Sequence, residues 1–168
     1  MFTNRTYPTP AGDLNVIARH DGDTPDRPVV VAAGFCPVAD LVERLPGVEP
    51  GDVRPTGRLG PVDAAMARYL DGDVAALDDV VVDQSGTELQ QKVWSELRAI
   101  PAGQTRTYTE LAAASGRPRA VRAAGTACGR NLIAPFVPCH RALRSDGTLG
   151  GYYYGLDVKR WLLAHEAS

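Results

Sequence analysis

The sequence predicts an α+β protein in two parts, a small α/β unit in residues 1–83 and a mainly helical unit in residues 84–168. Three observations indicate this division. Strand-like and helix-like apolar runs alternate in the first part, helical periodicity dominates the second, and the charge balance changes sign near Gln84. Residues 1–83 carry 7 Lys and Arg against 14 Asp and Glu, and residues 84–168 carry 11 against 6, so the two balances are −7 and +5.

Bulk composition narrows the class of protein. Apolar residues make up 44% and charged residues 23% of the 168 residues, as in ordinary globular proteins. The sequence has no run of about 18 apolar residues and no apolar N-terminal segment, so we expect no membrane span, no secretory signal and a cytoplasmic location. Three widely spaced cysteines, Cys36, Cys128 and Cys139, indicate reduced thiols. Without CxxC or HExxH spacing, no metal site is expected.

The first part has the pattern of a hairpin followed by helices. Leu14, Val16 and Ala18 alternate with other residues, which is typical of a half-buried strand. A β-branched run that follows a turn-rich stretch indicates a second strand. The expected elements are a strand at 14–20, a turn at 21–28, a strand at 29–35, a helix at 38–45 and, after a stretch rich in Gly and Pro, a helix at 61–70.

The second part has strong helix signals. Ser85 and Glu88 have the spacing of a capping box and predict a helix at 86–100. Thr107 and Glu110 form a second such pattern, which predicts a helix at 108–115 that ends at Gly116. A further helix at 119–131 would complete a helix-turn-helix, and a last helix is expected at 157–168.

Small residues crowd one part of the helix predicted at 119–131, and arginines surround them. Gly125 inside a helix costs about 1 kcal/mol relative to Ala, so close approach to another surface is expected. That surface is either a neighbouring helix or a DNA groove, and the dense arginines and the positive charge of residues 84–168 favour DNA. A simple drift in composition between the halves remains the alternative explanation of the charge.

Cys139 stands between Pro138 and His140, in the stretch PFVPCHR. A cysteine reacts as the thiolate, and a neighbouring histidine oriented by a third group is the usual base. Side chains of successive residues in an extended segment point to opposite faces, so His140 needs a bend in the chain or a bridging water to serve Cys139. Glu166, in the last helix, could orient this imidazole or could be a solvated residue. The alternative is an inert buried cysteine beside a surface histidine.

The residues Val137-Pro138-Cys139-His140-Arg141 give the chain a specific resemblance. Arg122 and Asn131 precede them, and Gly150-Gly151-Tyr152 and a helix containing Trp161-Leu162-Leu163 and Glu166 follow. In this order and spacing the chain resembles, from about Leu89 onward, the O6-alkylguanine-DNA alkyltransferases, also called methylated-DNA–protein-cysteine methyltransferases. The resemblance implies a ribonuclease-H-like N-terminal domain and a winged-helix-like C-terminal domain that binds DNA and accepts the alkyl group.

The resemblance also implies residue roles. Cys139 would accept the alkyl group from O6 of guanine permanently, with O4-alkylthymine as a second candidate substrate. His140 would take the thiol proton through a water, and Glu166 would hold His140. Tyr108 would rotate the nucleotide, Asn131 would be a hinge, and Arg122 would fill the gap left by the flipped base. The DNA-binding set would be Arg119, Ala120, Arg122, Ala123, Gly125, Thr126 and Tyr108, and the substrate pocket would comprise Val137, Pro138, Tyr152, Tyr153 and Tyr154.

The partner implied is double-stranded DNA containing alkylated guanine, bound by a monomer, with cooperative binding on DNA left open. No cofactor or metal is implied, and no membrane. The sequence departs from the family pattern at three places: Leu132 stands where proline is common, Ala142 where a β-branched residue is usual, and Tyr153 and Tyr154 where Ser or Gly is usual. We expect these tyrosines to narrow the pocket against bulky adducts.

Three other functions are compatible with parts of the pattern. The first is a non-catalytic binder of alkylated DNA that flips the base for other repair factors, but relatives of that kind lack the cysteine. The second is a helix-turn-helix regulator that senses alkylation through its thiol, for which the sequence offers no second DNA-binding domain. The third is a cysteine hydrolase, which would need an oxyanion hole and repeated turnover.

Overall fold

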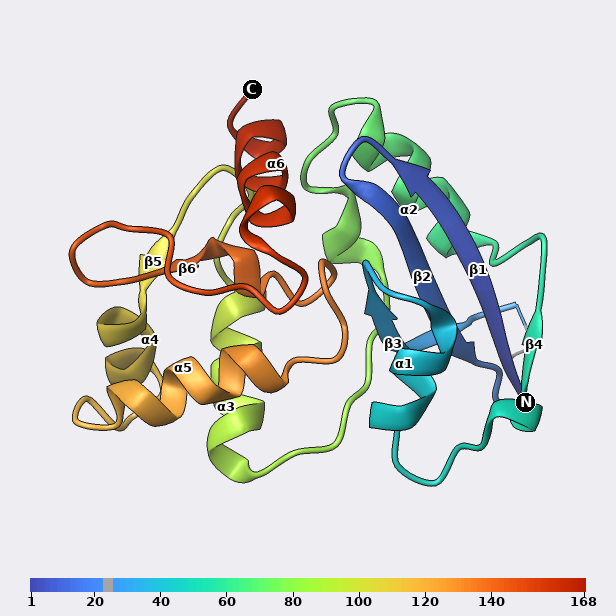
Figure 1. The fold of residues 1–168 in the computed structure, drawn as a ribbon, viewed down its shortest axis with the longest axis horizontal. Helices are drawn as coiled ribbons and strands as arrows, with labels where there is room; N and C mark the ends of the chain where they lie inside the picture. Colours follow the sequence, from blue (N-terminus) through green and yellow to red (C-terminus); the bar gives the residue numbers. More distant parts are fainter. Residues whose placement is uncertain (23–25) are drawn as a thin grey trace. The chain divides into compact units, whose positions relative to one another are not determined.

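The computed structural model describes residues 1–22 and 26–168 (Figure 1). Residues 23–25, which belong to the turn predicted at 21–28, lie outside the described residues. The elements follow in this order: β1 (Phe2–Thr9), β2 (Gly12–Arg19), β3 (Val29–Gly34), α1 (Val38–Arg44), η1 (Pro50–Asp52), β4 (Val53–Pro55), α2 (Pro61–Leu70), η2 (Ala76–Asp79), α3 (Glu88–Arg98), β5 (Arg106–Thr107), α4 (Tyr108–Ala114), α5 (Val121–Arg130), η3 (Cys139–Arg141), β6 (Ala142–Leu143) and α6 (Leu156–Ala167).

The chain forms two compact units. The first comprises Met1–Gln84 together with Leu132–Phe136, and the second comprises Ser85–Asn131 together with Val137–Ser168. The predicted division at 83/84 is linear and did not place residues 132–136 with the first unit. Their apolar side chains are buried, and the N–H of Ala33 in β3 donates to the carbonyl of Leu132 at 2.8 Å. This pairing is long-range, so no local sequence pattern indicates it.

The first unit is a mixed four-stranded sheet in the order β3-β2-β1-β4. The hairpin predicted from the sequence is confirmed as β2 and β3, which pair antiparallel. β1 also pairs antiparallel with β2 and pairs parallel with β4. β1 was not predicted, because its polar residues and its proline, Pro8, hide the alternating pattern of a strand. β1 contains Phe, Tyr and three Thr, which favour strands, and pairing on both edges stabilises it further.

β2 is buried on both faces, which corrects the expectation of a half-buried strand. The five residues Leu14–Ala18 are all buried. Ile17 packs in a cluster with Leu41 and Val42 of α1. Tyr7 pairs with Leu14 and therefore lies on the other face, where its hydroxyl donates to Asp63 of α2 at 2.6 Å. Helices α1 and α2 thus cover opposite faces of the sheet.

The second unit begins with α3, whose start differs from the prediction. Thr87, not Ser85, is the N-cap: its side chain accepts from the N–H of Gln90 at 3.2 Å, and Gln90 Oε1 accepts from the N–H of Thr87 at 2.9 Å. Ser85 with Glu88 and Thr87 with Gln90 both fit the capping-box pattern, so the spacing in the sequence does not distinguish the two starts of the helix. Gly86 lies against the ring of Trp94, where a Cβ would approach within 2.6 Å.

Helices α4 and α5 pack together and are joined by a short turn, as the helix-turn-helix prediction requires. The capping box of Thr107 and Glu110 is confirmed, and Gly116 adopts a φ of +82° just after α4. α5 begins at Val121, so Arg119 precedes the helix and Ala120 is its N-cap.

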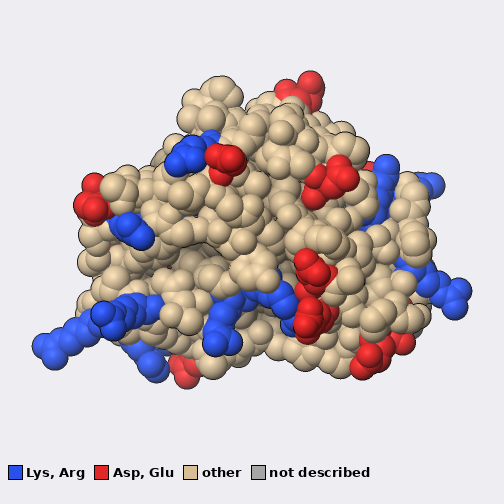
Figure 2. Space-filling view, in the orientation of Figure 1, with Lys and Arg blue, Asp and Glu red and all other residues tan. Residues whose placement is uncertain are grey.

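The small residues of α5 divide between two faces. Ala124 and Ala127 are buried, and Trp94 of α3 donates from Nε1 to the carbonyl of Ala127 at 2.9 Å. Ala123 and Thr126 are exposed on the other face, together with the arginines of this region. Figure 2 shows basic side chains gathered over the edge where α4 and α5 lie in Figure 1. The packing interpretation is therefore confirmed for the buried face, and DNA contact by the exposed face stays a prediction.

The last helix, α6, carries a buried polar stripe, and strands β5 and β6 form a short parallel pair. None of the helices in residues 1–22 and 26–168 is long and apolar enough to cross a membrane.

Candidate active site

Cys139 lies at the first position of a single turn of 3-10 helix, η3. Its N–H donates to the carbonyl of Val137 at 2.9 Å, and the N–H of Arg141 donates to the carbonyl of Pro138 at 3.0 Å. Pro138 fixes the backbone at the start of this turn. The bend that the sequence analysis required between Cys139 and His140 is therefore present. Cys139 is half-buried and forms no disulfide with another of the described residues.

His140 and Glu166 form a fully buried pair. His140 Nε2 lies 2.8 Å from Glu166 Oε2, and the side chains are 0% and 1% exposed. An ionised carboxylate can only accept, so Nε2 carries the proton and donates. Nδ1 of a neutral ring is then an acceptor. This Nδ1 is buried and has no hydrogen-bond partner among residues 1–22 and 26–168.

The ionisation states of this pair follow from burial and from a third residue. Burial lowers the pKa of His140, and its hydrogen bond to Glu166 opposes that effect, so the ring is neutral at pH 7. Burial by itself raises the pKa of Glu166, but hydrogen bonds and charge from His140 and Arg141 outweigh it and lower the pKa to about 2. Arg141 Nε donates to Glu166 Oε1 at 2.7 Å, and its Nη1 donates to the carbonyl of Ile100 at 2.7 Å.

Lys159 is a structural feature of the site that the sequence analysis missed. It is 0% exposed, and Nζ donates to the carbonyls of Ala142 at 2.8 Å, Leu149 at 2.5 Å and Gly151 at 3.3 Å. Burial lowers its pKa. These bonds hold the loop between β6 and α6 against the helix. A signal was available: Lys159, Leu162 and Glu166 have the i, i+3, i+7 spacing of one helix face, and all three are buried.

The role of Arg141 was missed as well. Arg141 is the last residue of the PCHR motif, but nothing in that motif indicates that its guanidinium binds Glu166, which lies 25 residues away. An arginine that is 2% exposed requires a buried carboxylate partner. Sequence alone does not show that it is buried.

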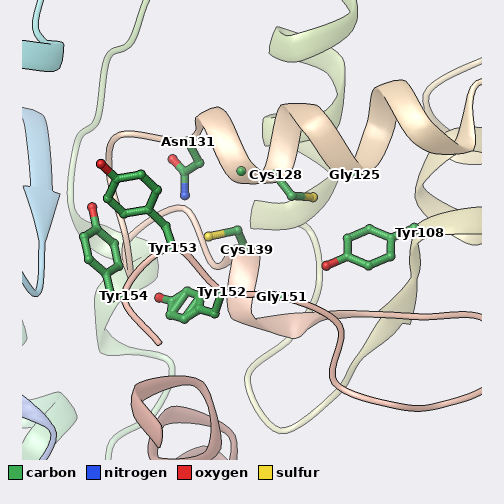
Figure 3. A pocket seen from close by; sticks show the side chains of 10 residues that line it. Tyr108, Gly125, Cys128, Asn131, Cys139, Gly151, Tyr152, Tyr153 and Tyr154 are labelled. Carbon is green, nitrogen blue, oxygen red and sulfur yellow. The ribbon is translucent and has the colours of Figure 1, made fainter. Parts of the chain in front are cut away.

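A cavity of about 370 Å³ opens beside Cys139 (Figure 3). It brings together several predicted site residues that are far apart in sequence. Its lining residues are Tyr108, Gly125, Cys128, Gly129, Asn131, Cys139, Gly151, Tyr152, Tyr153 and Tyr154. Val137 and Pro138, predicted as pocket residues, are buried and are not among the lining residues. The carbonyl of Val137 instead accepts from Asn131 Nδ2 at 2.8 Å, and the hinge role of Asn131 stays a prediction.

Tyrosine rings border the cavity. Tyr154 makes edge contacts with Tyr152 and Tyr153, with ring centroids 5.8 and 5.0 Å apart. Tyr153 is 59% exposed, so its ring extends to the rim. In the view of Figure 3, Tyr108 lies on the other side of Cys139 from Tyr153 and Tyr154. Burial raises the pKa of Tyr108 to about 12, so its hydroxyl stays protonated and can donate.

The remaining predicted residues lie outside the cavity. His140 and Glu166 are buried and do not line it. The predicted DNA-binding residues Arg119, Arg122, Ala123 and Thr126 are exposed, and Ala120 is half-buried. Cys128, not predicted as a pocket residue, does line the cavity, and burial raises the pKa of its thiol. It is therefore protonated at neutral pH and is a poor nucleophile.

The depressed pKa of Glu166 predicts a specific dependence of stability on pH. Because the folded-state pKa is about 2 and the ordinary value is 4.5, the stabilisation is complete above pH 4.5 and is lost as the pH falls toward 2. In urea denaturation, the difference in free energy of unfolding between the wild type and Glu166→Gln should therefore narrow by about 2 kcal/mol between pH 5 and pH 2.5. Glu88→Gln, at an exposed position, is the control. If the difference in free energy of unfolding between the wild type and Glu166→Gln stays constant with pH, the lowered pKa of Glu166 is wrong.

Comparison with known proteins gives consistent matches. Residues 88–168 match the family described as "6-O-methylguanine DNA methyltransferase, DNA binding domain". The methylated-DNA–protein-cysteine methyltransferase of Salmonella typhimurium is 47% identical over 107 residues, 64% of this chain and 63% of that protein. The crystal structure of the Mycobacterium tuberculosis O6-methylguanine methyltransferase has a TM-score of 0.78 and 33% identity, covering 99% of this chain and 93% of that chain.

A further crystal structure, of Mycobacterium tuberculosis OGT in complex with DNA, has a TM-score of 0.77 and 33% identity over 98% of this chain and 92% of that chain. The alignments with the Salmonella relatives span 43% to 63% of those proteins, which is less than two thirds. The mycobacterial protein, in contrast, is matched over nearly its whole length, on the same mixed α/β fold. The chain belongs to the family of methylated-DNA–protein-cysteine methyltransferases.

Proposed function

We propose that this chain repairs DNA by moving the alkyl group of O6-alkylguanine onto Cys139, once per molecule. The single observation that carries the proposal is the half-buried thiol of Cys139 in a base-sized cavity, directly followed in η3 by the buried His140–Glu166 pair. Family membership supports the same reaction. O4-alkylthymine is a second candidate substrate.

The proton transfer uses the free acceptor of His140. A water between Cys139 and Nδ1 of His140 would take the thiol proton and pass it to the ring, which leaves a thiolate. Glu166 accepts from Nε2 and so stabilises the imidazolium that forms, while Arg141 holds Glu166 in place. The buried Nδ1 without a protein partner supports this route.

The alkyl transfer is a direct displacement. The thiolate sulfur attacks the alkyl carbon, an S–C bond forms and the C–O6 bond breaks, and guanine leaves as an anion that takes up one proton. The proton lost by the thiol balances this uptake. No cofactor enters these steps. Because the thioether is stable, each molecule reacts once.

Substrate binding requires the alkylated base to leave the duplex. Asn131, Tyr108 and the tyrosines 152–154 would then surround the base, since flat rings suit a flat ligand. Arg122, exposed on α5, would occupy the gap in the duplex. Arg119, Ala120, Ala123, Gly125 and Thr126 would complete the DNA surface, with α5 as the recognition helix.

Several finer expectations belong to the same proposal. The first unit would be a ribonuclease-H-like support domain and the second a winged-helix-like domain, divided in sequence near 83/84. The partner would be double-stranded DNA, bound by a monomer in the cytoplasm. The mycobacterial relative with DNA supports DNA as the partner. The mixed sheet of the first unit and the α4–α5 pair of the second support the two fold assignments.

The test is the mass of the intact protein after incubation with excess O6-methylguanine duplex, followed by peptide mapping. We expect one added methyl on Cys139, one restored guanine per protein molecule and no further turnover. Cys139→Ala should remove no methyl group, and Cys128→Ala should react like the wild type. An unmodified protein that binds the lesion tightly would replace the proposal with a non-catalytic, base-flipping binder. Repeated turnover would also contradict it.

The tyrosine rim predicts how the pocket selects substrates. Tyr154 contacts both neighbouring rings, so Tyr154→Gly should open the rim and speed the reaction with free O6-benzylguanine several-fold, and more than with methylated duplex. Single-turnover rates with both substrates measure this. Tyr153→Gly, at the more exposed position, should have the smaller effect. Benzyl transfer that is equal or slower in Tyr154→Gly argues against a narrowing role.

The position of Arg122 predicts a defect confined to duplex substrates. Arg122→Ala should slow repair of methylated duplex by about ten-fold or more, because the flipped-out state loses a stabilising side chain. Reaction with free O6-benzylguanine should be unchanged, because no base has to leave a stack. Arg160→Ala, an exposed arginine on α6, is the matched control. Equal losses on both substrates would indicate a structural role for Arg122.

A further inference from the structure

Residues 132–136 leave the second unit just after Asn131 and return to it at Val137. Within the first unit this segment is firmly held. The side chain of Leu132 packs in the core cluster with Ile17, Leu41 and Val42. Its carbonyl accepts from the N–H of Ala33 at 2.8 Å, and Ile133 forms a parallel bridge with Ala33. The segment therefore behaves as part of the sheet edge beside β3.

The N–H of Leu132 has its own partner in the side chain of Gln84. Gln84 Oε1 accepts this N–H at 3.0 Å, across 48 residues of sequence. Leu132 is 7% exposed, so its amide loses most of its access to water on folding. A buried amide without an acceptor is unfavourable, and Gln84 removes that penalty. Gln84 is half-buried and is the last residue of the first stretch of the first unit.

The segment is joined directly to the nucleophile. Asn131 Nδ2 donates to the carbonyl of Val137 at 2.8 Å and so closes the two ends of the segment. The same carbonyl accepts from the N–H of Cys139 at 2.9 Å. A displacement of Leu132 would move Asn131, the adjacent residue, and through this shared carbonyl would disturb the turn that presents Cys139.

We infer that Gln84 is a positioning residue for alkyl transfer. It holds Leu132 through a hydrogen bond to the backbone, and Leu132 fixes the segment whose closed ends orient Cys139 in the cavity. This inference rests on the proposed function and deepens it, because it gives the first unit a defined part in the reaction. Displacement reactions depend steeply on the approach of the attacking atom, so a small shift of the sulfur is enough to slow transfer.

The experiment compares Gln84→Met with Gln84→Glu. Met has a similar length without an oxygen acceptor, whereas Glu keeps an oxygen at the same position. Single-turnover transfer from free O6-benzylguanine is measured over a range of concentrations, which separates the maximal rate from the half-saturating concentration. We expect Gln84→Met to lower the maximal rate about five-fold with the half-saturating concentration unchanged. Gln84→Glu should retain most of the wild-type rate.

Two controls separate positioning from stability. Gln91→Met, at an exposed position of α3, should react like the wild type. Circular dichroism and urea denaturation must show that each variant is fully native under the assay conditions, since loss of stability alone would leave the maximal rate of the native protein unchanged. A proline at position 132 has no N–H. In the Leu132→Pro background, Gln84→Met should therefore lower the maximal rate no further.

The outcomes are distinct. A wild type that transfers neither the benzyl group of the free base nor the methyl group of O6-methylguanine duplex contradicts the proposed function itself. If the wild type transfers methyl alone, the variants are compared on the methylated duplex. If the wild type reacts and Gln84→Met reacts equally fast, or if Gln84→Glu is as slow as Gln84→Met, the inference is wrong and the proposed function stands. A further five-fold loss of maximal rate when Gln84→Met is added to Leu132→Pro also overturns the inference. Should Leu132→Pro fail to fold, the comparison of Met with Glu at position 84 decides.

Discussion

The buried carboxylate of Glu166 is the constraint on which the site depends. It joins the end of α6 to the turn that carries Cys139, because one oxygen accepts from His140 and the other from Arg141. Burying a charge is unfavourable unless hydrogen bonds and an opposite charge compensate, and here both are present. The position is poor for a lone carboxylate, since the C-terminal end of a helix repels negative charge. Arg141 and the imidazole N–H supply the compensation that makes the position tenable.

That constraint also sets the chemistry of His140. With Nε2 committed to Glu166, the ring must offer Nδ1 as its acceptor, and burial keeps the ring neutral so that it can accept. Two adjacent residues in a strand could not share this task, because their side chains would diverge. The 3-10 turn at η3 bends the backbone at these two residues, and Pro138 and the carbonyl of Val137 stabilise this turn. The reactivity proposed for Cys139 thus depends first on the geometry of the backbone in this turn.

The sequence predicted those elements whose signals lie within a few consecutive residues. The helices could be predicted because apolar spacing and caps act within a few residues, and α2 begins and ends where the prediction placed it. The ambiguity at Ser85 and Thr87 shows the limit of such signals, since both residues fit one motif. β1, the return of residues 132–136 to the first unit, and the buried Lys159 all depend on partners far along the chain. For the site, residue types in family spacing predicted Cys139, His140 and Glu166, and the structure places His140 against Glu166 and Cys139 in the cavity. The binding of Arg141 to Glu166 and the exclusion of Val137 and Pro138 from the cavity depend on the three-dimensional fold and have no local signal.

The glycine and alanine content of α5 shows how one helix can meet two demands at once. Buried Ala124 and Ala127 let α3 approach closely enough for Trp94 to reach a backbone carbonyl of α5. On the cavity side, a Cβ added at Gly125 would lie 4.0 Å from Cδ1 of Tyr108, an ordinary contact distance. Gly150 is tighter, because a Cβ there would approach the Tyr108 ring and hydroxyl within 3.3 Å. Gly150 is therefore the glycine that the position of Tyr108 requires, whereas Gly125 weakens the helix but lines the cavity beside Cys139, where it leaves the space of a side chain open.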